Sequence, residues 1–288
     1  MIALASGCLD PFANLALEES LLEGSRLPRR AIFLYVDGPC VVVGRNQNPW
    51  IEASPSACVP VLRRISGGGA VYHDEGNLNW SLIVPRDEHD REAELAFVAS
   101  ALASLGLRVE ADERGALRFA GQGPFSGAKV SGTARRILRD RVLHHGTLLV
   151  AADLERMSAC LGGATVARSA APSSVPSRVA NLAQAAPGLR VDDVASALAR
   201  AASGREAESA WGLADGLALE RAERRLRSWE WTWGATPPFS IEVGGRASIE
   251  VRGGIVTSAS GPGADALAGL VGSRFDYGLP AVAEALTG

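Results

Sequence analysis

Strand-like runs fill the first half of this chain and helix-like runs the second, and that order limits the possible folds. Short apolar runs typical of buried strands stand close together between residues 31 and 150. They are AIFLYV (31–36), CVVVG (40–44), VPVLRR (59–64), GAVYH (69–73) and LNWSLIV (78–84). Helical spacing follows from residue 153 onward. Grouped strands followed by grouped helices predict an α+β fold, with a mixed, largely antiparallel sheet packed with helices.

Local signals mark where these segments begin and end. Asp10 before Pro11 predicts a capped helix that runs to about residue 25, and Gly106 ends a helix that starts near residue 91. Turn residues predict two β-hairpins, one at Asp37-Gly38-Pro39 and one at Arg139-Asp140-Arg141. Further helices are expected at 153–161, 191–202, 212–227, 264–271 and 279–286.

The chain changes character near residue 227. Beyond it, the alternating residues Trp229, Trp231 and Trp233 predict a strand that packs between two parts of the molecule. Glycine pairs then indicate turns in a short tail rich in strand signals, with helices at its end. We therefore expect two domains, 1–227 and 228–288, the second of them a small α+β unit.

Composition excludes several classes of function. The chain has 288 residues and a net charge of −3, so it lacks the basic surface expected of a nucleic-acid-binding protein. No apolar run reaches 18 residues, and the N-terminus does not resemble a signal peptide, so neither membrane insertion nor secretion is expected. Four scattered cysteines and four histidines, without ligand spacing, predict a cytoplasmic protein with no disulfide framework and no metal site.

Three consecutive glycines stand between strand-like runs in RRISGGGAVYHDEGN (63–77). The stretch is not a dinucleotide fingerprint or a P-loop, because a strand and not a helix follows it, and no GxSxG motif occurs nearby. Glycines without Cβ atoms allow a ligand to lie against the main chain, and exposed N–H groups donate to phosphate oxygens. A sharp hairpin corner or a bulge would also use glycines here.

One lysine, Lys129, stands among 29 basic residues. Arginine carries a planar, permanently charged fork, whereas lysine offers a compact charge on a flexible stem. The two residues therefore do different work at a phosphate or a carbonyl. Lys129 is a candidate catalytic residue, or a surface residue that a bias toward arginine has left unchanged.

Six segments, in order, resemble the lipoate–protein ligases, which are related to biotin–protein ligases and octanoyltransferases. They are DPFANLALEE (10–19), VVVGRNQNPW (41–50), RRISGGGAVYHDEGN (63–77), AKVSGTA (128–134), HHGTLLV (144–150) and SVPSRVANL (174–182). The stretch SWEWTWGATPPFS (228–240) resembles the start of the accessory domain in larger ligases. The resemblance thus implies a catalytic domain over 1–227 and a short accessory domain over 228–288.

The resemblance implies an ATP-dependent reaction in two steps. Lipoate attacks the α-phosphate of ATP, with Mg²⁺, to give lipoyl-adenylate and pyrophosphate. A lysine on a lipoyl domain of a 2-oxoacid dehydrogenase acyltransferase subunit, or on the glycine-cleavage carrier protein, then accepts the lipoyl group as an amide. No tightly bound cofactor is implied.

The same resemblance assigns roles to individual residues. Lys129 would bridge lipoate and the α-phosphate and act in catalysis. Lipoate would lie along Gly67, Gly68, Gly69 and His73, next to Lys129. Contacts to ATP or the adenylate would come from Arg64, Gly69, Ala70, Val71, Tyr72, Asn77 and Lys129.

Several alternatives stay open from sequence. His73 could instead pair with Asp74 at a strand end, and since His144 and His145 alternate on a strand, at most one of them faces the site. The segment 162–173 is basic in typical ligases but carries only Arg168 here. This departure leaves open a lipoyl- or octanoyltransferase that uses an already activated acyl donor. Biotin ligation and a non-catalytic binding protein of the same fold are less well matched.

Overall fold

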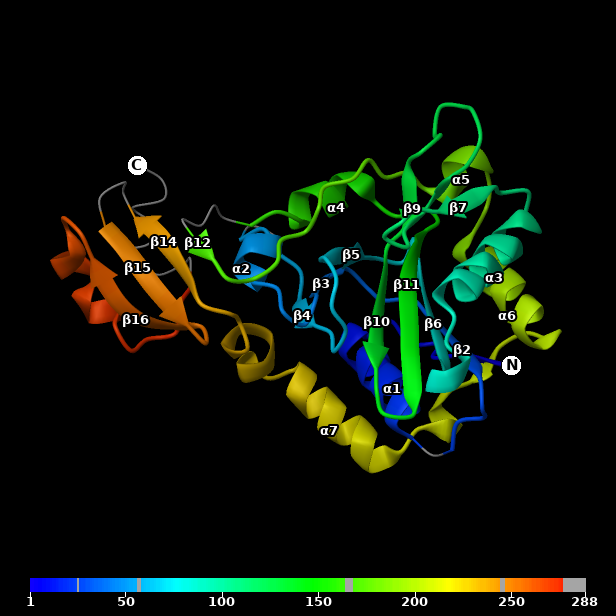
Figure 1. The fold of residues 1–288 in the computed structure, drawn as a ribbon, viewed down its shortest axis with the longest axis horizontal. Helices are drawn as coiled ribbons and strands as arrows, with labels where there is room; N and C mark the ends of the chain where they lie inside the picture. The colour runs from blue at the N-terminus through cyan, green and yellow to red at the C-terminus, as the bar shows by residue number, and fades with distance from the viewer. Residues whose placement is uncertain (25, 56–57, 164–167, 244–246, 277–288) are drawn as a thin grey trace.

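A six-stranded mixed sheet forms the centre of the larger part of the molecule (Figure 1). The computed structural model describes residues 1–276 apart from 25, 56–57, 164–167 and 244–246. Neighbouring strands in this sheet are antiparallel from β10 to β2 and parallel from β2 to β13. In spatial order they are β10 (Thr133–Ile137), β11 (Arg141–Leu149), β6 (Asn77–Pro85), β2 (Ala31–Tyr35), β1 (Ile2–Ala5) and β13 (Glu208–Ser209).

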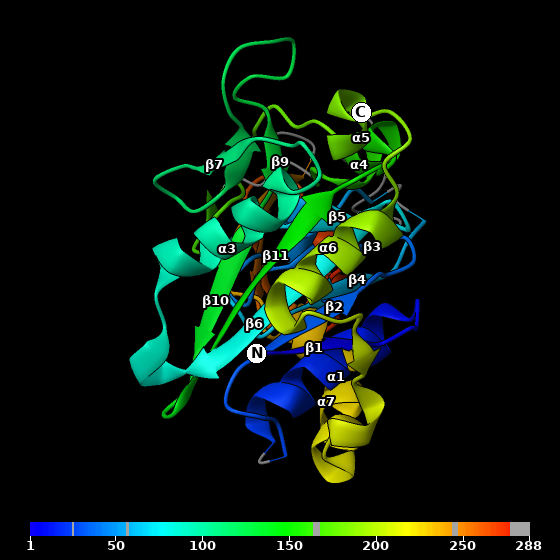
Figure 2. The same ribbon diagram turned by 90° about the vertical axis from the view of Figure 1, so that its right-hand side faces the viewer.

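Helices cover both faces of this sheet. Helices α3 (Arg91–Ala103) and α6 (Val191–Ser203) pack on one face and share a core cluster with Trp80 and Leu148 (Figure 2). Helix α1 (Pro11–Glu23) packs on the other face, and α7 (Gly216–Leu226) lies against α1. Shorter helices are α2 (Pro49–Glu52), α4 (Leu154–Cys160), α5 (Leu182–Ala185), η1 (Arg86–Glu88), η2 (Trp211–Leu213), η3 (Glu230–Gly234) and η4 (Ala264–Leu270).

Two small sheets complete this part of the molecule. The first contains β4 (Val61–Arg63), β3 (Cys40–Val43) and β5 (Val71–His73), and the second contains β7 (Val109–Ala111), β8 (Leu117–Phe119) and β9 (Lys129–Ser131). The predicted hairpin at Asp37-Gly38-Pro39 is wrong, because β2 and β3 belong to different sheets. Strand β3 pairs with β4 and β5, and buried Asp37 holds the side chain of His73. The second predicted hairpin, β10 with β11, is confirmed.

A four-stranded antiparallel sheet forms the C-terminal unit. Its strands are β12 (Arg168–Ser169), β14 (Phe239–Val243), β15 (Ala247–Arg252) and β16 (Ile255–Ser260). Trp231 and Trp233 lie on the π-helix η3, and Trp229 precedes it with helical backbone angles, so the predicted strand is wrong. The boundary near residue 227 stays a prediction, and one short strand of this sheet comes from before it.

The α+β prediction is confirmed, with most strand pairs antiparallel. Asp10 caps α1 as expected, since its carboxylate accepts hydrogen bonds from the amides of Phe12 and Ala13. The expected helix at 279–286 lies outside the described residues. Within the described ranges, no helix has both the length and the apolar character needed to cross a membrane.

Candidate active site

A cavity of about 390 Å³ opens beside the glycine run. Its wall includes Gly68, Gly69 and Ala70 on one side and Lys129 with Gly132 on another. Residues 172–175 and 177 add a further wall. The cavity thus brings together the two sequence features that stood out, although they are 60 residues apart along the chain.

Lys129 begins strand β9, and its main chain is fixed on both sides. Its amide donates to the carbonyl of Arg178 at 2.9 Å, and its carbonyl accepts from the amide of Ala180 at 3.1 Å. Burial lowers the pKa of the Lys129 ammonium from its ordinary value, and Arg118 lowers it further, whereas Asp112 raises it. Within the described part of the chain, no carboxylate pairs with this ammonium, so its charge faces the cavity.

Each glycine of the run has a different reason to lack a side chain. Gly68 has φ +85°, a conformation that favours glycine. A Cβ on Gly69 would lie 3.0 Å from Ser174 Oγ, so the segment 172–175 needs this gap. A Cβ on Gly67 would meet nothing within 4 Å. The protein's own chain therefore accounts for two of the three glycines, and only Gly67 has space that a ligand could use.

The amides of the run differ as well. Ala70 N–H donates to Ser174 Oγ at 2.8 Å. Among the described residues, neither Gly68 nor Gly69 has an acceptor for its amide N–H. Two main-chain donors beside the Lys129 ammonium are suited to bind an oxyanion.

The side chain of Arg64 supports the glycine run by hydrogen bonds to its carbonyl groups. It lines the cavity, yet its guanidinium turns inward and donates to the carbonyls of Val42 at 3.1 Å and Gly69 at 2.8 Å. Burial lowers its pKa to about 10, so the side chain stays charged at neutral pH. These contacts make Arg64 a support for the loop, and its predicted contact with ATP stays a prediction.

A buried polar chain links helix α1 to the glycine run. His145 Nδ1 lies 2.9 Å from Glu18 Oε1, and its Nε2 lies 2.6 Å from Ser66 Oγ. Ser66 Oγ also accepts from Arg64 Nε at 3.0 Å. His145 lines the cavity, whereas His144 points to the opposite face and pairs with Glu94. One histidine of the two therefore faces the site, as alternation along β11 requires.

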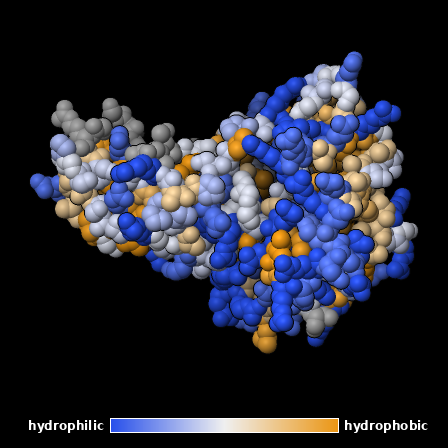
Figure 3. Space-filling view, in the orientation of Figure 1, coloured by the Kyte–Doolittle hydropathy of each residue, from blue (hydrophilic) through white to orange (hydrophobic). Residues whose placement is uncertain are grey.

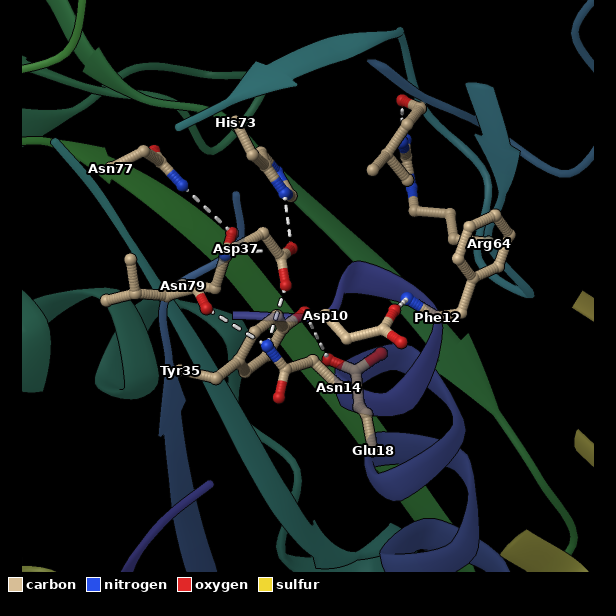
Figure 4. A network of polar contacts seen from close by, with 12 residues as sticks. Asp10, Phe12, Asn14, Glu18, Tyr35, Asp37, Arg64, His73, Asn77 and Asn79 are labelled. Carbon is tan, nitrogen blue, oxygen red and sulfur yellow. Dashed lines mark hydrogen bonds and ion pairs between the residues drawn. The ribbon is translucent and has the colours of Figure 1, made fainter. Parts of the chain in front are cut away.

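His73 forms a second buried pair, but with Asp37 and not with Asp74 (Figure 4). The His73 Nδ1 to Asp37 Oδ2 distance is 2.8 Å, and Asn14 Nδ2 donates to the other oxygen of Asp37 at 2.8 Å. Asp74 instead accepts from the amides of Gly76 and Asp153. His73 lines the cavity, and its Nε2 is buried without a hydrogen-bond partner among the described residues.

Asp37, Cys40 and His73 place possible metal ligand atoms within 4.8 Å of one another. Burial raises the pKa of the Cys40 thiol well above its ordinary value, and Asp37 raises it further. The carboxylate is already paired with His73 and with the side-chain amide of Asn14, and Cys40 lies outside the cavity lining. This cluster is better explained as polar core behind the cavity.

The remaining predicted residues divide between the cavity and the core. Val71 lines the cavity beside Ala70. Tyr72 and Asn77 are buried and lie outside its lining. Gly67 lines a neighbouring cavity of about 320 Å³ instead.

The segment that covers the cavity brings little charge to it. Arg168 belongs to β12, has an 85% exposed side chain and lies 3.9 Å from Glu250 in the C-terminal unit. Ser174 holds the segment down, because its amide donates to Glu52 Oε1 and its Oγ accepts from Gln47 Nε2. The covering residues 172–175 are therefore uncharged, and Ser174 anchors them by hydrogen bonds.

One protein-family model matches the part of the chain that forms this cavity. Residues 10–203 match the model of the lipoyl protein ligase A/B catalytic domain, which is more than half of the chain. The chain belongs to this family. The match covers the glycine run, Lys129 and the segment that covers the cavity.

Solved structures of lipoate enzymes share the fold. P. falciparum LipL1, in complex with lipoate, is 19% identical with a TM-score of 0.68, covering 99% of this chain and 92% of that chain. A bi-partite lipoate protein ligase from Thermoplasma acidophilum, studied with its E2 lipoyl domain, is 23% identical with a TM-score of 0.62 (81% and 96% covered). A lipoate-protein ligase A bound with ATP is 23% identical with a TM-score of 0.60, and the match covers 81% of this chain and 98% of that chain. At these identities the likeness supports the fold.

Sequence reasoning missed several residues of this lipoyl ligase family site. Glu18, Ser66, Gln47 and Ser174 support the cavity wall or its cover, although none of them was singled out as a site residue. Each lies inside a segment that carries the resemblance, so position within those segments was a usable signal. Nothing in the residue types alone revealed their pairing, because the partners come from distant parts of the chain.

Proposed function

We propose that this protein is a lipoate–protein ligase. It would activate lipoate with ATP to lipoyl-adenylate and transfer the lipoyl group to a lysine of an acceptor domain. The observation that supports this most directly is that Lys129 and the glycine run line one cavity. A thin acyl chain would lie in the part lined by Leu15, Tyr35, Val42, His73 and Asn79.

The proposed chemistry uses the charge of Lys129 and the free amides of Gly68 and Gly69. An ammonium about 4 Å from a developing negative charge stabilises it by roughly 4 kcal/mol at an effective dielectric constant near 20. The acyl-phosphate anhydride and the tetrahedral intermediate of transfer would both gather charge there. One set of groups would thereby serve activation and transfer.

Mg²⁺ would enter with ATP. Asp112 is the one carboxylate among the residues that line this cavity, and Arg118 Nε already donates to it at 2.8 Å. Mg²⁺ keeps most of its ligands as phosphate oxygens and water. In this proposal the nucleotide therefore holds the ion, and Asp112 is the residue of the lining that could reach it. The predicted contact of Asn77 with ATP stays a prediction.

A transferase that takes an already activated acyl donor is the second candidate. Its support is the covering segment, which turns Arg168 toward the C-terminal unit and whose described residues offer the cavity no cation to neutralise a triphosphate. Cys40 does not supply a nucleophile, because it is buried and outside the cavity lining. Acyl transfer would then depend on Lys129 as in the ligase.

Two assays separate these candidates. Pyrophosphate release is measured with lipoate, ATP and Mg²⁺, and transfer is followed by mass spectrometry of a purified lipoyl domain, with ATP and lipoate or with synthetic lipoyl-adenylate. The ligase is expected to be active in all three reactions. Transfer from lipoyl-adenylate without pyrophosphate release would identify the transferase, and inactivity toward an E2 lipoyl domain and the glycine-cleavage carrier protein would contradict both.

Lys129 is tested in the same assays. Lys129→Ala is expected to lower both pyrophosphate release and transfer by about a hundredfold or more, because it removes the charge at the proposed oxyanion. Lys129→Arg is expected to lower both strongly despite its charge, since a planar fork cannot occupy the position of a compact ammonium. Normal rates for Lys129→Ala would show that the assignment is wrong.

A further inference from the structure

A second cavity, of about 320 Å³, lies directly beside the first. The two share the lining residues Gly68, Arg114, Thr133 and Ala134. The second cavity lacks Lys129 and the covering segment, and is lined by parts of α3, β10 and the β7–β8 turn. It therefore lies against the proposed reaction centre, on a side that the covering segment does not line.

Three arginines surround this second cavity, and we call them the arginine rim: Arg91, Arg114 and Arg135. They come from three separate elements, the start of α3, the β7–β8 turn and β10. Arg91 donates to the carbonyl of Glu113 at 3.2 Å, and Arg135 contacts His89 Nε2 at 3.2 Å. Among the described residues no carboxylate pairs with any of the three.

Some surface arginines of the described chain pair with carboxylates, as in Arg200–Glu206, Arg221–Glu23 and Arg227–Glu223, whereas others, such as Arg108, stand alone. The whole chain is acidic, with a net charge of −3. The distinctive feature of this site is that three arginines without a carboxylate partner among the described residues gather around one cavity. Such a cluster attracts an anionic partner.

The surface next to the rim also has an apolar component. Strand β10 is the edge of the large sheet, so no further strand covers its outer side. Arg135 and Ile137 lie on the same side of β10, and Ile137 is 51% exposed. Figure 3 shows an apolar patch within the largely hydrophilic face that carries β10. An apolar contact next to unpaired charges is typical of a protein interface.

We propose that the arginine rim docks the acceptor protein, through acidic residues that flank the lysine to be modified. This inference rests on the proposed function and adds the recognition of the partner to it. The acceptor lysine would approach the acyl group beside Lys129 from the side of Arg114 and Thr133, which line both cavities, since Gly68 and Ala134 lie too close together to admit it. Arg91 and Arg135 line the second cavity alone, which separates them from the proposed nucleotide position.

Charge reversal of the rim tests this proposal on the full-length protein. Arg91→Glu combined with Arg135→Glu is compared with wild type in transfer from synthetic lipoyl-adenylate to an apo E2 lipoyl domain, over a range of domain and salt concentrations. The expected result is a roughly tenfold or greater fall in kcat/KM for the domain, through KM, and a weaker dependence on salt. Pyrophosphate release without acceptor is expected to stay within about twofold of wild type, since rim residues act on encounter and not on activation.

Arg108→Glu is the matched control. It is an exposed arginine at the opposite end of the β7–β8 hairpin from Arg114, lines neither cavity and is expected to leave both reactions unchanged. An unchanged kcat/KM for the domain in the folded double variant would overturn the proposal. So would a raised KM for ATP in pyrophosphate release, which would assign the arginines to the triphosphate.

If the proposed function is wrong, the wild-type protein will itself be inactive, which distinguishes that outcome from a defect of the double variant alone. Binding of the apo lipoyl domain, measured by calorimetry, would still report on docking in that case. Weaker binding to the double variant than to wild type would support the rim, and equal binding would overturn it.

Discussion

The Lys129 ammonium occupies space that a side chain at residue 132 would need, and residue 132 is a glycine. A Cβ on Gly132 would lie 3.2 Å from Lys129 Nζ and 3.4 Å from its Cε. Both contacts involve the far end of a flexible side chain, so the ammonium would move and the backbone would not. The site therefore offers a way to displace the charge without removing it.

Gly132→Ala is expected to leave thermal unfolding almost unchanged and to lower transfer from lipoyl-adenylate by about tenfold to a hundredfold, since small misplacements of a catalytic group are costly. Gly212→Ala is the control, because a Cβ there meets nothing within 4 Å. Normal transfer by Gly132→Ala would argue against a positioned ammonium.

Glu18 is a second residue whose charge can be tested. Burial alone would raise its pKa, but His145 and hydrogen bonds from Ser81 and Tyr35 outweigh burial and bring the pKa below the ordinary value of 4.5. A lowered carboxyl pKa adds stability above pH 4.5, and this contribution is lost as the pH falls through the lower, folded-state value.

Glu18→Gln is expected to lower the free energy of unfolding by about 1.5–3 kcal/mol at pH 7, the range for hydrogen bonds to a charged group. The difference from wild type should shrink as the pH falls below 4.5, because wild type then loses the same contribution. Urea unfolding between pH 3 and pH 7 measures both values. A difference that grows toward low pH would contradict the assignment of charge to Glu18.

At the scale of elements, the glycine run and the covering segment 172–175 behave as one unit. Ser174 joins them, since its Oγ accepts from Ala70 N–H and its amide donates to Glu52. The run also packs against the end of β3, where a Cβ on Gly44 would lie 2.1 Å from the carbonyl oxygen of Gly68. The glycines thus mainly allow segments of the chain to pack closely against one another, namely the glycine run against Ser174 and against the end of β3.

Gly69→Ala is expected to push Ser174 away and to raise hydrogen exchange across 172–175, because the added Cβ would lie 3.0 Å from Ser174 Oγ. Gly67→Ala is the matched variant with open space around its Cβ, and it should leave exchange unchanged. The same variant tests the predicted contact of lipoate with Gly67, which lines the neighbouring cavity and not the proposed acyl pocket: unchanged lipoate binding would show that this contact is absent. Equal exchange in the two variants would show that Ser174 does not depend on the gap at Gly69.

Sequence predicted the elements well where local patterning decides them. Helices α1 and α3 follow from caps and periodicity, and the β10–β11 hairpin follows from its turn. It failed where distant contacts decide, as at Asp37, whose pairing with His73 separates β2 from β3, and at the tryptophans of η3. In the site, the meeting of Lys129 with the glycines came from resemblance, whereas the hydrogen bonds of Glu18 and Ser174 needed coordinates.

At the scale of the whole molecule, one arginine joins the two parts of the chain. Arg63 is fully buried and donates to the carbonyls of Trp231, Thr232, Arg45 and Gln47. Burial, together with the charge of Arg45, lowers its pKa to about 10, so the guanidinium is charged at neutral pH, and no carboxylate of the described residues pairs with it.

A second link is aromatic. Trp50 of α2 packs within the core of the C-terminal unit, with ring centroids 4.8 Å from Trp233 and 5.3 Å from Phe239. The two predicted domains therefore share a cationic centre and an aromatic core.

Arg63→Lys is expected to lower the free energy of unfolding by about 3 kcal/mol, since three donors cannot replace five and buried carbonyls lose their partners. Urea unfolding measures this loss, and hydrogen exchange over 231–236 should rise at the same time. Arg252→Lys, at an exposed position of β15, is expected to change neither. Unfolding of Arg63→Lys at the wild-type urea concentration would contradict a joining role.

Arg63 and Arg64 are adjacent, yet one guanidinium faces the C-terminal unit and the other faces the glycine run. A single peptide bond thus separates the joint between the two parts of the chain from the wall of the cavity. Any tilt of the C-terminal unit that pulls on Trp231 or Thr232 would be transmitted to the carbonyls of Gly67 and Gly69. Severing the chain at residue 227 would consequently loosen the pocket itself, and not merely shorten the protein.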